Sequence, residues 1–149
     1  MANEILAGVI GGVAGSLAGA LFGYISARGV NTANREGVRL DQRLDGVDIV
    51  LESLVRESVA YWLTSAKDAA AESRIKGLIE DLGFRIYNLG GFGVSAKDVE
   101  DAQLLADDLA NIITGDDFES ERRTADVDKP ERIRIASALV SAKFHPHRR

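Results

Sequence analysis

The sequence predicts an all-α protein, with one N-terminal transmembrane helix followed by a small cytoplasmic helical bundle of about four helices. Three observations support this prediction. Residues Ile5 to Ala27 carry no charged side chain, several later segments show helical apolar spacing, and no apolar–polar alternation is long enough for a strand. We therefore expect a span at residues 1–28, a juxtamembrane hinge at residues 29–39 and a cytoplasmic domain at residues 40–149.

The uncharged segment has the length of a membrane span. As a helix it would rise about 34 Å, enough for a hydrocarbon core of about 30 Å. A cleaved signal peptide is one alternative, but it would begin with basic residues, and Glu4 is the only charge before Arg28. A buried helix of a soluble domain is the other, but a domain this small has little surface with which to surround it.

Flanking charge predicts the orientation of the span. Arg28, Arg35, Arg39 and Arg43 follow it, whereas no Lys or Arg precedes it. The positive-inside rule then places the C-terminal domain in the cytoplasm and the N-terminus outside. The expected location is the inner (cytoplasmic) membrane, crossed once.

Composition excludes several function classes. The chain has no cysteine, so disulfides, thiolate metal sites and a cysteine nucleophile are excluded. The formal net charge is −5, which argues against binding a nucleic-acid duplex through its phosphates.

Glycines recur within the span at a four-residue interval, at Gly11, Gly15, Gly19 and Gly23. This interval places them in one stripe, where missing side chains let two helix backbones approach closely. The stripe resembles the glycine-zipper pattern of homo-oligomeric membrane helices, among them channel and pore-forming proteins. The resemblance covers only the span and implies a helix–helix interface in a homo-oligomer, in contact with membrane lipid.

After the span, apolar and small residues continue with alternating gaps of three and four. That period is typical of a left-handed coiled-coil seam between copies. The alternative is an amphipathic helix from Leu40 to Trp62 that packs on its own domain. The seam positions are Val30, Ala33, Gly37, Leu40, Leu44, Val47, Leu51, Leu54, Ser58 and Tyr61.

Three further helices are predicted from apolar periodicity and end signals. The first covers Ser73 to Leu89 and ends at a glycine-rich turn, and the second begins after Ser95 in a capping-box pattern and ends at Gly115. The third begins at Asp128 as an acidic cap, and the tail after Lys143 is expected to fray. The expected inner faces are Ile75, Leu78, Ile79, Leu82, Ile86 and Leu89; then Val99, Ala102, Leu105, Leu109, Ile112 and Ile113; then Ile133, Ala136, Leu139 and Val140.

No motif indicates a cofactor, a metal or a reaction. Residues Gly90 to Gly93 precede a helix but lack the lysine of a phosphate-binding loop, so they are interpreted as a helix–helix turn. His145 and His147 lack the carboxylates of a metal site. The acidic loop from Gly115 to Arg123 is expected to pair its own charges, with Phe118 anchoring it to the bundle. We expect no enzyme and no catalytic residues.

If the domain binds an anionic ligand, the sequence points to the arginines around the acidic loop, Arg122, Arg123, Arg132 and Arg134. The preferred hypothesis is a membrane-anchored homo-oligomer whose cytoplasmic domain binds or senses a protein partner or a small anionic ligand, as in a membrane-perturbing, defence-type bacterial effector. The alternative is a passive anchor for a protein-interaction domain. An enzyme whose site no motif reveals is a distant third.

Overall fold

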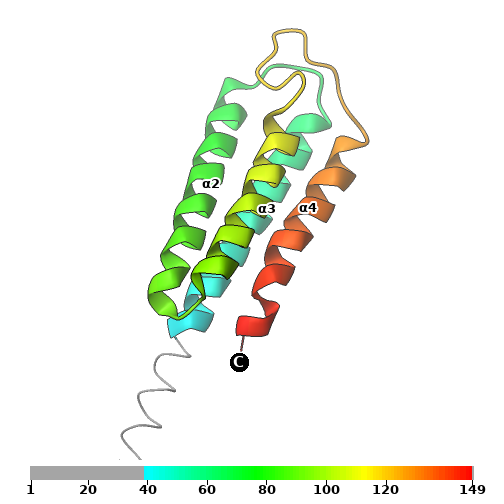
Figure 1. The fold of residues 1–149 in the computed structure, drawn as a ribbon. Helices are drawn as coiled ribbons and strands as arrows, with labels where there is room; N and C mark the ends of the chain where they lie inside the picture. The colour runs from blue at the N-terminus through cyan, green and yellow to red at the C-terminus, as the bar shows by residue number, and fades with distance from the viewer. Residues whose placement is uncertain (1–38, 149) are drawn as a thin grey trace, which may run out of the picture. The chain divides into compact units, whose positions relative to one another are not determined.

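A computed structural model describes residues 39–148, and within them every regular element is helical and no strand occurs. The four long helices lie side by side, and successive helices run in opposite directions (Figure 1). This arrangement confirms the predicted all-α helical bundle. The elements in order are a first helix at residues 39–62, α2 at Ala69–Asn88, the 3-10 helix η1 at Leu89–Phe92, α3 at Ala96–Thr114, α4 at Lys129–Phe144 and the 3-10 helix η2 at His145–His147.

None of the helices within residues 39–148 is long and apolar enough to cross a membrane. The predicted span from Ile5 to Ala27, its glycine stripe and the hinge up to residue 38 lie outside the described residues. They remain predictions from the sequence.

The seam of the first helix is buried inside its own bundle. Its positions from Leu44 onward are at most 3% exposed and join one core with residues of α2, α3 and α4. The prediction of a coiled-coil seam between copies is therefore wrong from Leu44 onward. The alternative prediction, an amphipathic helix that packs within its own domain, is confirmed. These buried positions are Leu44, Val47, Leu51, Leu54, Ser58 and Tyr61.

Local end signals explain where α2 and α3 begin and how they are joined. Asp68 caps α2 by accepting the backbone N–H of Ala71 at 2.9 Å, so α2 starts four residues before the predicted Ser73. Ser95 accepts the N–H of Asp98 at 3.1 Å, as its capping pattern predicted. In the connection between α2 and α3, Gly93 has a φ of 94°, a backbone conformation that residues with a side chain disfavour. The predicted helix–helix turn is therefore confirmed.

α4 differs from the prediction at both ends and on its inner face. Asp128, the predicted cap, makes no side-chain hydrogen bond to the helix. Asp126 takes this role instead, and its carboxylate accepts the N–H groups of Asp128 and Lys129. Phe144 is 2% exposed and anchors the end that was expected to fray. Leu139, predicted to face inward, is 53% exposed, because the inner face consists of Ile133, Ala136, Val140 and Phe144.

Candidate functional sites on the helical bundle

One end of the bundle is closed by aromatic side chains from the end of the first helix. Trp62 donates its indole N–H to the carbonyl of Ile113 at 3.0 Å, which ties this helix to the end of α3. The rings of Tyr61 and Trp62 meet edge to face with centroids 5.6 Å apart, a favourable geometry for aromatic pairs. Phe118 packs on Tyr61 with a centroid distance of 5.2 Å, so the predicted aromatic anchor of the loop is confirmed.

Two buried cations lie on these rings, and we call the group formed by Tyr61, Trp62, Arg123 and Lys129 the aromatic–cation cluster. The ammonium of Lys129 is 3.6 Å from the Trp62 ring centroid, and the guanidinium of Arg123 is 3.8 Å from that of Tyr61. Both cations are 1% exposed. A cation taken out of water needs such contacts together with hydrogen bonds.

Main-chain carbonyls and one acid supply those hydrogen bonds. Arg123 donates to the carbonyls of Tyr61, Thr64 and Ala66, which fixes the connection between the first helix and α2. Lys129 donates to the carbonyl of Gly115 at 3.2 Å and to Asp116 at 2.8 Å. The cluster therefore holds both connections at this end of the bundle.

Tyr61 also links the cluster to α2. Its hydroxyl donates to the buried carboxylate of Glu72 at 2.8 Å and accepts the backbone N–H of Glu119 at 3.2 Å. Burial, followed by the hydrogen bond to Glu72, raises the pKa of Tyr61 above its usual value.

The acids of the 115–128 loop pair with lysines of other elements rather than with arginines of the loop. Glu119 pairs with Lys76 of α2, and Glu121 pairs with Lys67 at 2.6 Å. The expectation that the loop pairs its own charges was therefore wrong, because the folded loop lies against the start of α2.

The four arginines predicted as an anion site do not form one site. Arg123 is buried and its two terminal nitrogens are used by carbonyls and Thr64, whereas Arg122 is exposed. Arg132 lines a groove against α3, and Arg134 lines another against the first helix. Residues two apart on a helix point in different directions, which separates this last pair.

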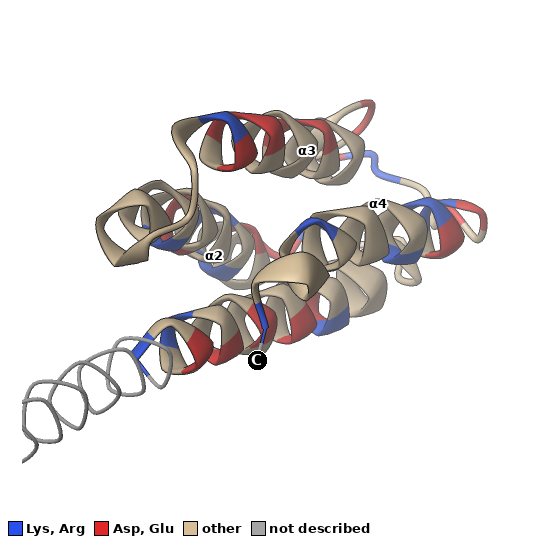
Figure 2. Cartoon of the chain, turned by 60° about the horizontal axis from the view of Figure 1, so that its bottom comes forward, with Lys and Arg blue, Asp and Glu red and all other residues tan. Residues whose placement is uncertain are grey.

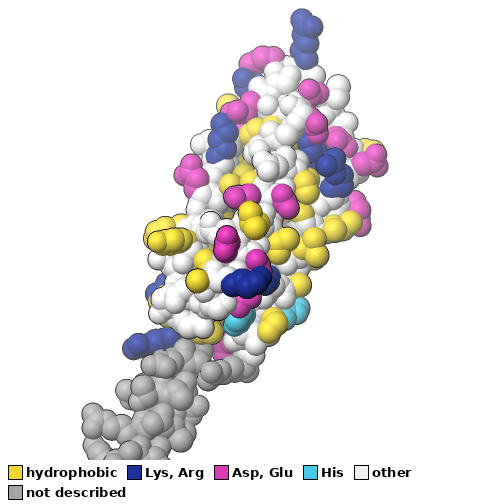
Figure 3. Space-filling view, viewed as in Figure 1, with side chains coloured by type: hydrophobic (Ala, Val, Ile, Leu, Met, Phe, Trp, Pro, Cys, Tyr) yellow, Lys and Arg dark blue, Asp and Glu magenta, His cyan; other side chains and the backbone are white. Residues whose placement is uncertain are grey.

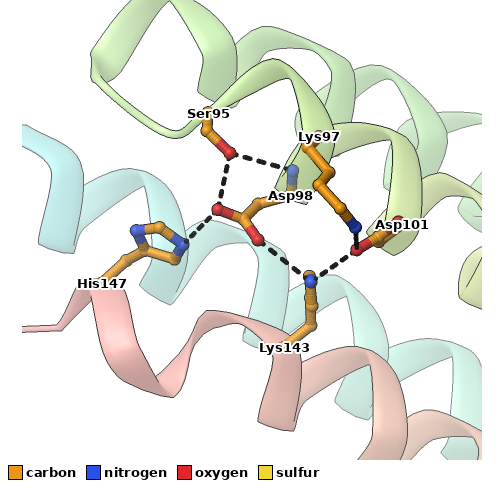
Figure 4. Close-up of polar contacts among 6 residues, drawn as sticks. All are labelled: Ser95, Lys97, Asp98, Asp101, Lys143 and His147. Carbon is orange, nitrogen blue, oxygen red and sulfur yellow. Dashed lines mark hydrogen bonds and ion pairs between the residues drawn. The ribbon is translucent and has the colours of Figure 1, made fainter.

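At the opposite end, a polar network joins the start of α3 to the end of α4 (Figure 4). Lys143 donates to Asp101 at 2.8 Å and lies 3.0 Å from Asp98. His147 Nε2 lies 3.4 Å from Asp98, and the Ser95 hydroxyl donates to the same carboxylate at 2.7 Å. Within residues 39–148, no three His, Asp or Glu side chains are grouped to hold a metal.

This network shifts the pKa of each carboxylate in the direction of an ion pair. Hydrogen bonds from Ser95 and then Lys143 lower the pKa of Asp98 below its usual 3.8. The hydrogen bond from Lys143, followed by that from Lys97, lowers the pKa of Asp101. Asp101 and then Asp98 raise the pKa of Lys143 above 10.5. The arrangement acts as an ionic clamp between two helix ends.

An apolar groove runs between the outer faces of α3 and α4, and we call it the α3–α4 groove. Figure 3 shows hydrophobic side chains gathered on the surface over these two helices. Ile135 is 55% exposed and Leu139 is 53% exposed, although both are large and apolar. The groove is lined by Leu105, Asp108, Ile112, Arg132, Ile135, Ala136 and Leu139.

The two helices that form the groove carry opposite charge (Figure 2). α3 has five acidic residues and one basic residue, and α4 has four basic residues and one acidic residue. Asp108 on α3 and Arg132 on α4 line the groove itself, and neither makes an ion pair within the described part of the chain. The groove therefore has an apolar floor and oppositely charged walls.

Sequence reasoning missed this groove because Leu139 was assigned to the inner face of α4. A signal was present, since Ile133, Ile135, Ala136, Leu139 and Val140 cover more than the stripe that one contact needs. Comparisons of the chain with protein-family models, with curated proteins and with solved structures find no match. The sites are therefore interpreted from their own geometry.

Neighbouring arginines provide a matched test of the aromatic–cation cluster. Arg123→Ala should lower the free energy of unfolding by about 3 kcal/mol, because buried carbonyls lose their donors. Arg122→Ala removes the same side chain from an exposed position and should change it by no more than about 0.5 kcal/mol. Urea unfolding of residues 39–149 measures both values. Equal losses in the two variants would contradict the assigned role of Arg123.

Acid unfolding tests the ionic clamp. Because the folded-state pKa of Asp98 and of Asp101 lies below 3.8, their contribution is fully present above that pH. It is lost as pH falls through the lowered values. Lys143→Met should therefore make the stability of residues 39–149 less steeply pH-dependent below pH 3.8, and unfolding followed by circular dichroism at a series of pH values measures this slope.

The control for this change is Arg134→Met. Within residues 39–148 the one ion pair of Arg134 is with Glu131, at 3.9 Å in an exposed position, so its loss should leave the acid slope as it is. If Lys143→Met and the parent lose stability with the same slope, the clamp does not contribute to acid sensitivity.

Proposed function

We propose that this chain is a membrane-anchored protein that associates with copies of itself. Ile5 to Ala27 cross the inner membrane with the N-terminus outside, and the helical bundle lies in the cytoplasm, where a second copy covers its α3–α4 groove. The observation that carries the proposal is this groove, with large apolar side chains exposed between an acidic and a basic helix.

The exposed apolar floor supports an interface at this face. A lone exposed leucine is ordinary on a protein surface, but contiguous apolar side chains framed by charges are typical of contact surfaces. Leu104, Ile135 and Leu139 are each more than half exposed on these two helices. Covering them removes apolar surface from water, which is the main favourable term in association.

The charges of the two helices favour a second copy as the partner. A two-fold axis parallel to the helices places α3 of one copy opposite α4 of the other, so the side of the groove that carries Asp108 meets the side that carries Arg132 twice. An axis across the helices would place α3 opposite α3 and oppose like charges. The parallel arrangement also brings Arg39 of both copies to the same end, as two chains anchored in one membrane require.

Across this contact, Asp108 of one copy would pair with Arg132 of the other. Both side chains line the groove and are exposed, so each has room for a partner without rearranging the bundle. The pair adds specificity to an otherwise apolar contact.

Anchoring would strengthen a contact that is weak in solution. Confinement to one membrane raises the effective concentration of the second copy. Association of the bundles would also bring the glycine stripes together, and contacts between small residues then add to the assembly. The proposal thereby couples the state of the cytoplasmic domain to the packing of helices in the bilayer, as a membrane-perturbing effector requires.

A charge exchange tests the paired copies. Asp108→Arg and Arg132→Asp should each weaken dimerisation of residues 39–149 by about tenfold or more, because each places like charges opposite each other. The double variant Asp108→Arg with Arg132→Asp restores opposite signs and should recover most of the affinity. Analytical ultracentrifugation over a concentration series measures all three.

An apolar pair of variants provides the matched control. Leu139→Asp places a charge in the groove and should abolish the dimer, whereas Ile49→Asp changes a 64% exposed residue of the first helix and should leave it intact. A parent fragment that stays monomeric at every concentration, together with a monomeric full-length chain, would overturn self-association through this face.

The glycine stripe is tested in the full-length chain. Gly19→Leu places a bulky side chain where two helix backbones would meet, so oligomers captured by cross-linking in detergent should be lost. Insertion should be maintained, because leucine is more apolar than glycine. Ala20→Leu, off the stripe, is the control and should be tolerated. Equal cross-linking of both variants would favour a passive anchor.

A further inference from the structure

A second candidate site lies away from the α3–α4 groove, where the first helix passes the end of α2 and η1. Two hollows of about 370 Å³ and 430 Å³ adjoin there, and Arg43 and Phe92 line both. Arg39 lines one of them, and Asp81, Phe84 and Arg85 line the other. We call these hollows together the arginine cleft, and each has the size of a site for a small ligand.

The arginine cleft is positively charged, although the chain as a whole has a net charge of −5. Its lining within residues 39–148 contains three guanidinium groups and one carboxylate, that of Asp81, which holds Arg85 through two contacts of 3.0 Å. Among residues 39–148, no acidic side chain forms an ion pair with Arg39 or Arg43. Among the described residues, an anionic ligand would meet two cations without an ion-pair partner and a third shared with Asp81.

The backbone of the first helix makes room for this arrangement. A Cβ atom at Gly46 would lie 2.8 Å from Nη1 of Arg85, so Arg85 reaches across from α2 onto the first helix. Gly46 is one turn beyond Arg43 on the same helix. The guanidinium groups of Arg43 and Arg85, from two different helices, therefore line the same hollow. Glycine inside a helix is less stable than alanine, and here it accommodates a cation.

Aromatic side chains frame the arginine cleft. The guanidinium carbon of Arg43 lies 4.9 Å from the ring centroid of Phe92, a cation–π contact that fixes the arginine and leaves its N–H edge for a ligand. Phe84 on α2 also lines the cleft and is 68% exposed, and Tyr87, one turn further along α2 and outside the lining, is 71% exposed. Arginine beside exposed aromatic rings is the composition that suits the level of lipid headgroups.

We propose that the arginine cleft binds the phosphate group of an anionic phospholipid. Guanidinium groups bind phosphate oxygens through paired hydrogen bonds. Arg43 lines both hollows, with Arg85 beside it in one and Arg39 beside it in the other. A headgroup is the expected source because Arg39 and Arg43 follow the end of the proposed span, Ala27, by only 12 and 16 residues. That choice of source rests on the proposed membrane anchor, whereas the phosphate chemistry does not.

The test uses the full-length chain in micelles of an uncharged detergent. Phosphatidylglycerol, phosphatidylcholine and inorganic phosphate are titrated separately, and native mass spectrometry counts the bound molecules. Phosphatidylglycerol should be retained in preference to the other two. Arg43→Gln should weaken its retention about fivefold, and Arg39→Gln with Arg43→Gln about twenty-five-fold, at the known contribution of one arginine near an anionic headgroup.

Two control variants sharpen the result. Arg122→Gln removes the same charge from an exposed loop position and should retain phosphatidylglycerol like the parent. Asp81→Asn frees Arg85 and should tighten retention. Circular dichroism of each variant confirms that the bundle stays folded.

Each outcome decides the inference. Equal retention by Arg43→Gln and Arg122→Gln would overturn the arginine cleft as a site. Arg43-dependent binding of inorganic phosphate without preference for phosphatidylglycerol would overturn the lipid source. Retention of phosphatidylglycerol by a parent chain that stays monomeric at every concentration would overturn the proposed self-association and leave the cleft, so the two proposals fail separately.

Discussion

The stacking of Arg123 and Lys129 on Tyr61 and Trp62 is the interaction on which the rest of the bundle depends. Four antiparallel helices need three connections, and this cluster holds two of them, the one after the first helix and the 115–128 loop. Buried cations are costly unless every donor finds a partner. Main-chain carbonyls at and just after the ends of two helices supply most of those partners, although Nε of Arg123 has none among the described residues. The contacts of Lys129 also hold the start of α4 against the end of α3.

The bundle itself could be predicted from the sequence, because helical periodicity and end signals are local. Ser95 and Gly93 act within one or two turns of the chain, and the structure has both where the sequence placed them. The aromatic–cation cluster could not be predicted in this way. Its aromatic members are about 60 residues before its cationic members in the sequence, as in the hydrogen bond from Arg123 to the carbonyl of Tyr61. In addition, an arginine in an acidic loop is usually solvated.

The same limit explains the errors on either side of the core. A period of 3.5 residues in the first helix shows that one face is buried, but not whether another copy or the same chain covers it. The structure shows the same chain, through a core that includes Leu54 and Leu109. On α4, two apolar stripes overlap in sequence, and only the placement of α3 separates buried Val140 from exposed Leu139. The arginine cleft was missed because Arg85 reaches the first helix only after folding.

The two proposed surfaces have consequences for each other, because they use different faces. The α3–α4 groove is lined by residues of α3 and α4. The arginine cleft is lined by residues of the first helix, α2 and η1. A second copy in the groove would therefore leave both clefts of a pair open to ligand. Lipid bound in the cleft restrains only the copy that holds it, whereas the groove joins two copies. Headgroup binding would then set the orientation of each bundle before association, which lowers the rotational freedom that the weak groove contact has to overcome.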